Sequence, residues 1–323
     1  MIPSLTTNAL HRLSLALAAA TLIPGAALAQ VVTLGSTTAG ATGQMGRAIA
    51  ATVSELAPLN MRPQEMANTA DYMPLVNAGE IDFGISNVVQ LWFASQGTGM
   101  SAGQPGPDLR VVAVLQPFRA GLQVRDDGDI ATMQDVRGKR VPAFPDGSLG
   151  DHVMRAFLAN GGLGYDDVVG VPVPNFPRMW DSFREGSTDV TIDVPGSANS
   201  RELDAALGGI RFLSFNESPE ILAAMREWLP QTFLVEIGPD SGLPGFFEPT
   251  MINAYAYTFF ANAGVSEDRV YEVTKAMWDG EEALLGSGPI WAGLDRTGYA
   301  TDIDVPFHPG AIRFYREAGI WQE

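Results

Sequence analysis

The residues best placed to do chemistry are the threonines and glycines of 35–46, whose sequence is GSTTAGATGQMG. We expect a buried strand over 31–34 before this stretch and an amphipathic helix ending near Pro58 after it. A loop of small residues at a helix N-terminus offers hydroxyl and backbone N–H donors to a carboxylate or another small anion. The candidate donors are Thr37, Thr38, Gly40 and Thr42. The alternative is that the glycines only let the strand and the helix pack closely.

Other polar candidates follow further predicted strands. Asn87 follows the strand predicted over 79–85, and ligands of open α/β sheets lie beyond the carboxyl ends of strands. A second small-residue loop, 145–150, contains Ser148 and precedes another helix. Asp193 ends a strand of the second half and is a candidate acceptor for an ammonium group on the ligand. The remaining candidates are Thr69, as a further polar contact, and Tyr72 and Trp92, which would pack against the carbon body of the ligand.

The sequence gives little support for catalysis or metal binding. It has no cysteine, and His152 and His308 lack the spacing of zinc ligands. The pair Asp151-His152 has no Gly-x-Ser-x-Gly partner, and the glycine-rich stretch is neither a P-loop nor a Gly-x-Gly-x-x-Gly motif. We therefore predict no catalytic residue, no metal and no cofactor. Arg119 and Arg178 are possible bidentate partners of a carboxylate, although surface ion pairs are the simpler interpretation.

The elements that hold these residues form two similar units. Strand and helix patterns alternate over 31–117, which is typical of an α/β layer, and 118–249 repeats the order of strand, small-residue loop and helix. We assign 31–117 and 250–323 to lobe 1 and 118–249 to lobe 2, with hinge crossings near 117 and 240–250. Each lobe is predicted to be a mostly parallel sheet flanked by helices. Two such lobes can close on a ligand between them.

The beginning of the chain has the features of an export signal. A weakly basic start, a short apolar run and Ala27-Leu28-Ala29 predict a signal peptide over 1–29 that is cut near Ala29. The apolar run is too short to span a membrane. Without cysteine the mature chain has no lipid anchor, so we expect a protein free in the periplasm. The 20 basic and 37 acidic residues give a net charge of −17, which argues against nucleic acid and anionic membranes as partners.

Three phrases of the sequence resemble the solute-binding proteins of TAXI-type TRAP transporters. The most specific is 306–320, PFHPGAIRFYREAGI, which is similar to the C-terminal P-x-H-P-G-A-x-x-[YF]-Y-x-E-x-G of that family. The others are GEIDFGI at 79–85 and DVRGKRV at 135–141, the latter followed by Gly147-Ser148. The resemblance extends over about 31–320. It implies a type II periplasmic binding protein, whose ligand lies between two lobes and passes to a membrane permease driven by an ion gradient.

The resemblance is closer in the scaffold than in the pocket. The opening loop of the family usually reads S-T-G-G-T-Y-Y-P-x-G. The Thr, Tyr, Tyr and Pro positions of that loop hold Ala41, Thr42, Gly43 and Gln44 here. Tyr72 stands where asparagine is usual, and Asn87 and Trp92 replace a common glutamine and tyrosine. Binding of small carboxylates or amino acids is what the resemblance implies, and these departures concern the residues that would choose among them.

We therefore expect an exported, non-enzymatic receptor for a small anionic solute, a carboxylate or an amino acid, which works with the permease subunits of its transporter. One alternative is a receptor for an ATP-driven importer or a membrane sensor. Another is a periplasmic enzyme on the same fold. Neighbouring genes discriminate between the first two, since they would encode a fused multi-span permease or, instead, an ATPase or a histidine kinase. An activity lost on mutation of His152 or Asp193 without loss of ligand binding would indicate the enzyme.

Overall fold

The computed structural model describes residues 1, 30–38 and 40–322. The predicted signal peptide lies outside the described residues, apart from Met1. The strands are β1 (Gln30–Thr37), β2 (Leu59–Met66), β3 (Phe83–Asn87), β4 (Leu109–Arg125), β5 (Arg140–Ala143), β6 (Val169–Pro172), β7 (Val190–Asp193), β8 (Ile210–Phe212), β9 (Phe233–Ile237) and β10 (Thr250–Asn262). The α-helices are α1 (Gly40–Leu56), α2 (Thr69–Asn77), α3 (Val88–Gln96), α4 (Leu149–Asn160), α5 (Phe176–Arg184), α6 (Ala198–Leu207), α7 (Pro219–Trp228), α8 (Glu267–Asp279), α9 (Glu281–Gly286) and α10 (Pro309–Ala318).

A mixed sheet flanked by helices organises the molecule, and the predicted α/β class is confirmed. Its strand order is β2-β1-β3-β10-β4-β7, with β8 paired to β4 and β9 to β10, while β5 and β6 pair separately. β1 runs parallel to β2 and β3, whereas β10 runs antiparallel to β3 and β4. The sheet is thus less parallel than predicted, because the returning strand β10 is inserted between β3 and β4.

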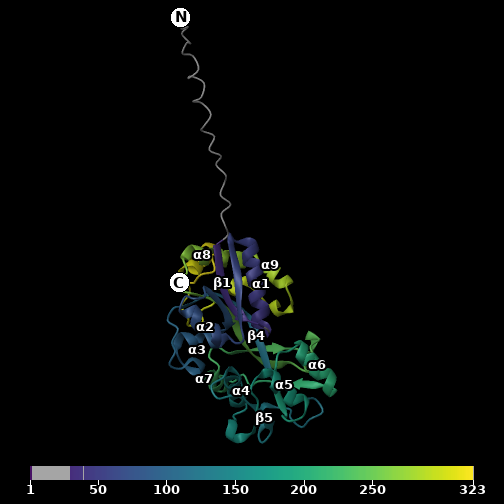
Figure 1. Cartoon of the computed structure of the whole chain (residues 1–323). Coiled ribbons are helices and arrows are strands. Elements are labelled where there is room, and N and C mark those ends of the chain that lie inside the picture. Colours follow the sequence, from purple (N-terminus) through teal and green to yellow (C-terminus); the bar gives the residue numbers. More distant parts are fainter. Residues whose placement is uncertain (2–29, 39, 323) are drawn as a thin grey trace.

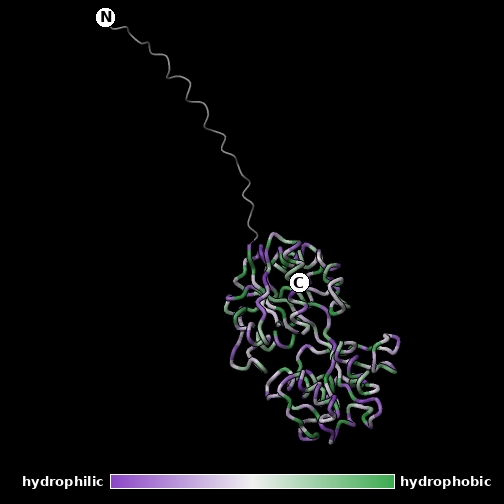
Figure 2. Tube along the Cα trace, turned by 45° about the vertical axis from the view of Figure 1, so that its right-hand side comes forward, coloured by the Kyte–Doolittle hydropathy of each residue, from purple (hydrophilic) through white to green (hydrophobic). Residues whose placement is uncertain are grey.

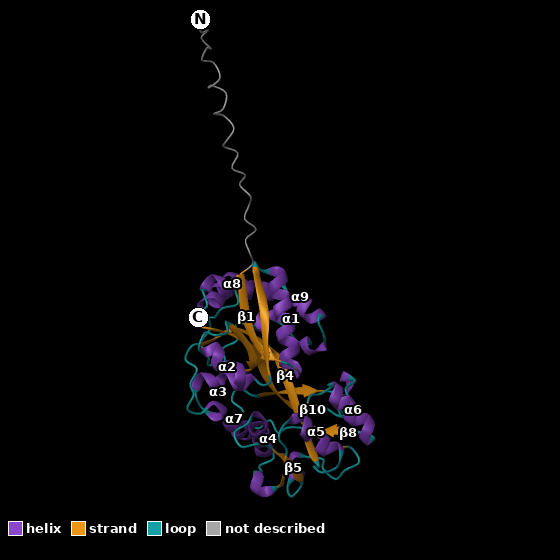
Figure 3. Ribbon diagram, in the orientation of Figure 1, coloured by secondary structure: helices purple, strands orange, loops and turns teal. Residues whose placement is uncertain are grey.

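Two long strands, β4 and β10, join the two ends of the molecule. β4 pairs with β10 over Leu109 to Ala120 and then with β7 and β8. The apolar pattern predicts two strands, over 109–115 and 122–125, and the structure has one strand of 17 residues instead. Figure 3 shows β4 and β10 passing from the part that contains β1 and α1 into the part that contains α5 and β8. We call these parts lobe 1 and lobe 2. The exact lobe boundaries given above stay a prediction.

The register of β4 and β10 is irregular where they cross between the lobes. Pro117 lies opposite Ala256, and the register shifts between Ala256 and Thr258. Proline donates no ladder hydrogen bond, and a bulge bends and twists a strand. The crossing predicted near 117 therefore coincides with a local weakness of an otherwise continuous pair of strands.

Helix α1 packs against β1 more closely than ordinary side chains allow. A Cβ on Gly46 would lie 2.6 Å from the Cβ of Ser36, and one on Gly43 would overlap the carbonyl oxygen of Thr37. The same side of the helix buries Met45, Ile49 and Val53 in the core. The prediction of a loop over 35–46 is therefore wrong, since β1 continues to Thr37 and α1 begins at Gly40. Gly43 and Gly46 serve close packing, as the alternative interpretation held, whereas a Cβ on Gly40 would meet no atom within 4 Å.

The segment 306–320 contains α10 and forms its contact with α8. His308 is the N-cap of α10, and its Nδ1 accepts a hydrogen bond of 3.1 Å from the backbone N–H of Gly310. A Cβ on Gly310 would overlap the carbonyl oxygen of Glu267 at the start of α8, so only glycine fits there. The motif thus stabilises lobe 1. Among the described residues, none of the helices has the length and apolar character needed to cross a bilayer.

Candidate ligand-binding site

The carboxyl ends of the parallel strands of lobe 1 lie at one edge of the sheet. Thr37 is the register partner of Met66, so β1 and β2 end level with each other. Leu34 pairs with Phe83, which places Asn87 level with Thr38. The register therefore brings the ends of β1, β2 and β3, and with them the starts of α1, α2 and α3, to a common edge (Figure 1).

The strands of lobe 2 point their carboxyl ends back towards lobe 1. β4 enters lobe 2 at Gly121, whose partner is Asp193, the last residue of β7. The backbone N–H of Asp189 donates to the carbonyl of Arg140 at 2.8 Å, so β5 and β7 begin side by side. β6 is parallel to β5. The two carboxyl edges consequently face each other across the β4–β10 crossing.

A direct contact between the lobes confirms that these edges are close. The rings of Phe93 on α3 and His152 in the first turn of α4 have centroids 4.9 Å apart. His152 also lies beside Trp228, whose carbonyl is 3.0 Å from its Nδ1. Both α3 and α4 begin at the facing edges, at Asn87 and Ser148. The predicted loops of the two lobes are thus on the same side of the hinge.

At the start of α1 the predicted donors are accessible. Thr38 and Gly40 are exposed, and Thr37 and Thr42 are half-buried. The N–H of Thr38 donates to the carbonyl of Met66 at 3.0 Å, which leaves its hydroxyl as the group to offer. Thr42 forms a side-chain hydrogen bond with Tyr257 that lowers the pKa of that phenol, although burial has the larger effect and raises it to about 12.

Three predicted residues of lobe 1 are occupied within the protein. Tyr72 has no exposed surface, and its hydroxyl donates to the carbonyl of Ile85, so it belongs to the core and cannot pack against a ligand as predicted. Its hydroxyl also lies 3.4 Å from that of the buried Thr69. Asn87 caps α3 by accepting from the N–H of Gln90 at 2.9 Å. Local helix capping and core packing account for these side chains.

Trp92, the remaining aromatic candidate, fits the prediction better. It is half-buried, and its indole ring lies edge-on to Phe93 at 5.6 Å between centroids. Its Nε1 is buried without a hydrogen-bond partner among the described residues. A buried donor without a partner is costly, and a ligand or a water molecule can supply the missing acceptor.

Ser148 and Asp193 occupy the facing edge of lobe 2. Ser148 is the N-cap of α4, where its Oγ accepts from the N–H of Asp151 at 3.3 Å. Asp193 is almost fully buried and accepts from Val194 N–H, Ser197 Oγ and Asn199 Nδ2. Burial raises the pKa of Asp193 to about 6, because those three neutral donors only partly offset the loss of water.

An aromatic cluster at the crossing was not predicted. Phe118 on β4 lies between Tyr255 and Tyr257 of β10, with ring centroids 5.4 and 5.5 Å away. Tyr257 in turn reaches Thr42, so the cluster borders the start of α1. The aromatic residues of 253–261 predict a strand, and alternate residues of a strand lie on the same face. That signal places the two tyrosines together, but the partner Phe118 depends on a pairing that the sequence does not reveal.

A cavity of about 470 Å³ opens at the facing edge of lobe 2. It is lined by Ala143, Phe144 and Pro145 at the end of β5 and by Pro172, Val173 and Pro174 at the end of β6. All six lining residues are apolar. The backbone N–H of Ser148 donates to the carbonyl of Pro145, so this cavity and the N-terminus of α4 are neighbours.

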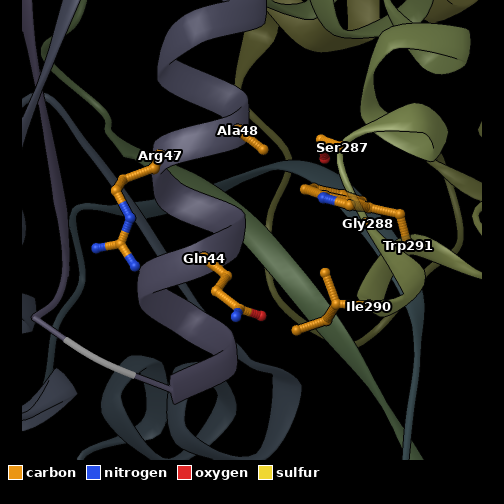
Figure 4. Close-up of a pocket in the computed structure, with 7 residues that line it drawn as sticks. All are labelled: Gln44, Arg47, Ala48, Ser287, Gly288, Ile290 and Trp291. Atoms are coloured by element: carbon orange, nitrogen blue, oxygen red, sulfur yellow. The ribbon is translucent and has the colours of Figure 1, made fainter.

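A second cavity, of about 430 Å³, lies along α1 and contains none of the predicted residues. It is lined by Gln44, Arg47, Ala48, Ser287, Gly288, Ile290 and Trp291. In Figure 4, Gln44 extends towards Ile290, whereas the guanidinium of Arg47 extends to the other side of the helix, where it pairs with Glu65. This cavity begins one turn after the start of α1, and none of its lining residues belongs to the strand ends described above.

Of the two arginines considered from the sequence, only Arg119 is available. Arg178 pairs with Asp181 at 2.9 Å, as expected for a surface ion pair. Arg119 is exposed on β4 next to the crossing and, within the described residues, forms no ion pair. Over residues 30–38 and 40–322, no three histidine, aspartate or glutamate side chains gather closely enough to hold a metal ion.

Comparison with known proteins agrees with this geometry. Residues 35–319 match the NMT1-like family. The chain belongs to the NMT1-like family. Solved structures share the fold of this NMT1-like protein at low sequence identity, and they show a type II periplasmic-binding-protein fold.

Two of those structures illustrate the likeness. PhnD1 from Prochlorococcus marinus, in complex with methylphosphonate, has 9% identity and a TM-score of 0.55, over 90% of this chain and 99% of that one. A TctC solute-binding protein from Polaromonas, without ligand, has 15% identity and a TM-score of 0.53, over 84% of this chain and 90% of that one. At such identities the likeness establishes the fold.

Proposed function

We propose that this NMT1-like protein is a non-enzymatic, extracytoplasmic receptor that captures a small organic acid between its two lobes. The observation that carries the proposal is the opposition of two carboxyl edges, each with a helix N-terminus, α1 in lobe 1 and α4 in lobe 2. Helix N-termini attract anions through their free N–H groups and their dipole. The structures with which the chain shares its fold include a phosphonate complex, which is in keeping with an anionic ligand.

The acid group would be bound at the start of α1. Thr37, Thr38 and Thr42 supply hydroxyls there, and Gly40, with φ of +74° and open space around it, leaves the backbone accessible. Ser148 would approach from α4 when the lobes close. These local donors act over a few ångströms in a dehydrated site, so they can offset the net charge of −17, which acts through screening solvent.

We further propose that the receptor serves a TAXI-type TRAP transporter and hands its ligand to the permease subunits from the periplasm. The support is the run of family-like phrases at 79–85, 135–141 and 306–320. A fused multi-span permease gene beside the gene for this chain is the expected finding. An ATPase or a histidine kinase gene in its place would favour an ATP-driven importer or a sensor system instead.

Isothermal titration calorimetry against monocarboxylates, dicarboxylates, amino acids and keto acids tests the receptor function. A specific ligand at about 100 times its Kd should raise the free energy of unfolding by about 2.7 kcal/mol, which a thermal-shift assay detects. Absence of both heat and thermal shift with every acid would contradict the proposal.

The substitution Thr42→Val tests whether the acid group binds at the start of α1. It keeps the shape of the side chain but removes the hydroxyl, so affinity for the ligand should fall about 5- to 10-fold, equivalent to about 1 kcal/mol. The matched control is Thr274→Val on α8, whose hydroxyl donates within its own helix to the carbonyl of Val270 at 2.7 Å. The control should bind with unchanged affinity. Equal affinities for the two variants would place the acid group elsewhere.

A further inference from the structure

The cavity at the facing edge of lobe 2 has an apolar surface without charged side chains. The cavity there is walled by alanine, phenylalanine, valine and three prolines. The ring of Phe144 packs on that of Phe176 at 5.1 Å between centroids, so this wall continues onto α5. Apolar surface of this kind favours an apolar ligand group, because water leaves both surfaces on contact.

The hinge adds flat aromatic surface next to the seat for the acid group. Phe118 is half-buried, and its ring contacts those of Tyr255 and Tyr257. The hydrogen bond between Tyr257 and Thr42 fixes this cluster beside the start of α1. Aromatic rings prefer offset or edge-on contacts with other rings, which are worth more than area burial alone.

The apolar wall of lobe 2 offers no cation to a second acid group. Arg119, which forms no ion pair among the described residues, follows Phe118 in β4 and therefore projects from the opposite face of that strand. Arg178 of α5 is paired with Asp181, and Arg155 of α4 is paired with Asp151 and lies between the rings of Tyr165 and Trp228. The charged group at the end of β7 is the carboxylate of Asp193, which repels an anion. A second carboxylate placed against the apolar wall would lose its water without gaining a cation.

Resting on the function proposed above, we propose that the ligand is an organic acid with a single acid group and a flat, apolar body, such as an aromatic ring. The acid group binds at the start of α1. The body lies against Phe118 and reaches the apolar cavity of lobe 2. Dicarboxylates and glutamate, which carry a second acid group on a short aliphatic chain, fit this arrangement poorly.

The test is calorimetric competition among benzoate, succinate and glutamate with the full mature chain. Benzoate should bind at least 10-fold more tightly than either of the others. Tighter binding of succinate or glutamate would overturn this inference while leaving the receptor function intact. If none of the acids in the wider panel binds, the receptor function fails, and the inference fails with it.

Two variants separate ring recognition from general damage. Phe118→Leu keeps an apolar side chain but removes the ring, so benzoate affinity should fall at least 5-fold. The control is Tyr271→Leu on α8, which removes a ring that contacts Phe314 and a hydroxyl that binds Glu317, and it should leave benzoate affinity unchanged. Pro174→Glu places a charge at the exposed rim of the cavity and should also weaken benzoate, whereas the same change at the exposed Pro239 should not. Unaltered benzoate affinity in both site variants would overturn the inference.

Discussion

Asp193 shows how a single residue of lobe 2 responds to its surroundings. Its carboxylate is buried, it receives three neutral hydrogen bonds and no cation, and its pKa rises to about 6 from an ordinary value of 3.8. Burial disfavours the ionised form in the folded state more than in the unfolded state. The group therefore favours folding most at low pH, and this contribution is lost as the pH rises from about 4 through 6.

The substitution Asp193→Asn removes this titration. The free energy of unfolding of the variant, relative to that of the unmodified protein, should increase by about 2 kcal/mol between pH 4 and pH 8, since one pKa unit corresponds to about 1.4 kcal/mol. Urea unfolding at several pH values measures the difference. A difference that stays constant with pH would mean that Asp193 is solvated or paired in solution.

At the scale of elements, the packing of α1 on β1 determines where the donors of lobe 1 lie. Gly46 faces Ser36 so closely that an added methyl group has no room. A Cβ added to Gly286 in α9 would have no atom within 4 Å. Gly46→Ala should therefore destabilise the protein by about 1–3 kcal/mol through overpacking. Gly286→Ala, an identical change in an open helix, should stay within about 0.5 kcal/mol. Equal unfolding midpoints in urea would contradict the close approach of α1.

Much of the element order could be predicted from the sequence. Apolar runs predict most of the strands, and Pro309 and the helical pattern after it predict a last helix over 311–319, within two residues of α10. Glycines misled the prediction at 35–46, because the same residue type serves a loop and a tight helix–strand contact. β9 and α9 were missed because they are short and lack strong periodicity, and β4 was divided because Pro117 and Arg119 interrupt its apolar pattern.

The candidate site was only partly predictable for a related reason. The ends of strands could be located, and the register places Thr37, Thr38, Asn87 and Asp193 at the facing edges, where Ser148 caps α4. Whether a polar side chain remains available depends on its neighbours, and Asn87 and Tyr72 are held by Gln90 and Ile85. The contact of Phe118 with Tyr255 and Tyr257 needs the pairing of strands that lie far apart in the sequence, which local patterns do not encode.

At the scale of the whole molecule, β4 and β10 are the connection through which the lobes move. The tube in Figure 2 gathers into two bodies joined by few segments. The register shift next to Pro117 belongs to the strand pair β4–β10. A ligand that contacts both edges binds the closed arrangement more tightly than an open one, and so shifts the population towards closure. The contact of Phe93 with His152 adds a hydrophobic link on the closing side.

The absence of cysteine makes closure measurable with two introduced labels. Gln44→Cys on α1 and Glu202→Cys on α6 place spin labels at exposed positions of lobe 1 and lobe 2. Pulsed electron–electron double resonance measures the distance between the two labels. Its distribution should become shorter and narrower when the tightest-binding acid of the calorimetric panel is added. Identical distributions with and without that acid would exclude closure on the ligand.

The central claim, that the facing strand ends of the two lobes enclose the ligand, is tested most directly by a crystal structure with the bound acid. We predict electron density for the acid group at the start of α1, within hydrogen-bond distance of Thr42, and for the carbon body between Phe118 and the wall formed by Phe144 and Pro145. Density in the cavity between α1 and Trp291, or on any other surface away from the crossing of β4 and β10, would contradict the account.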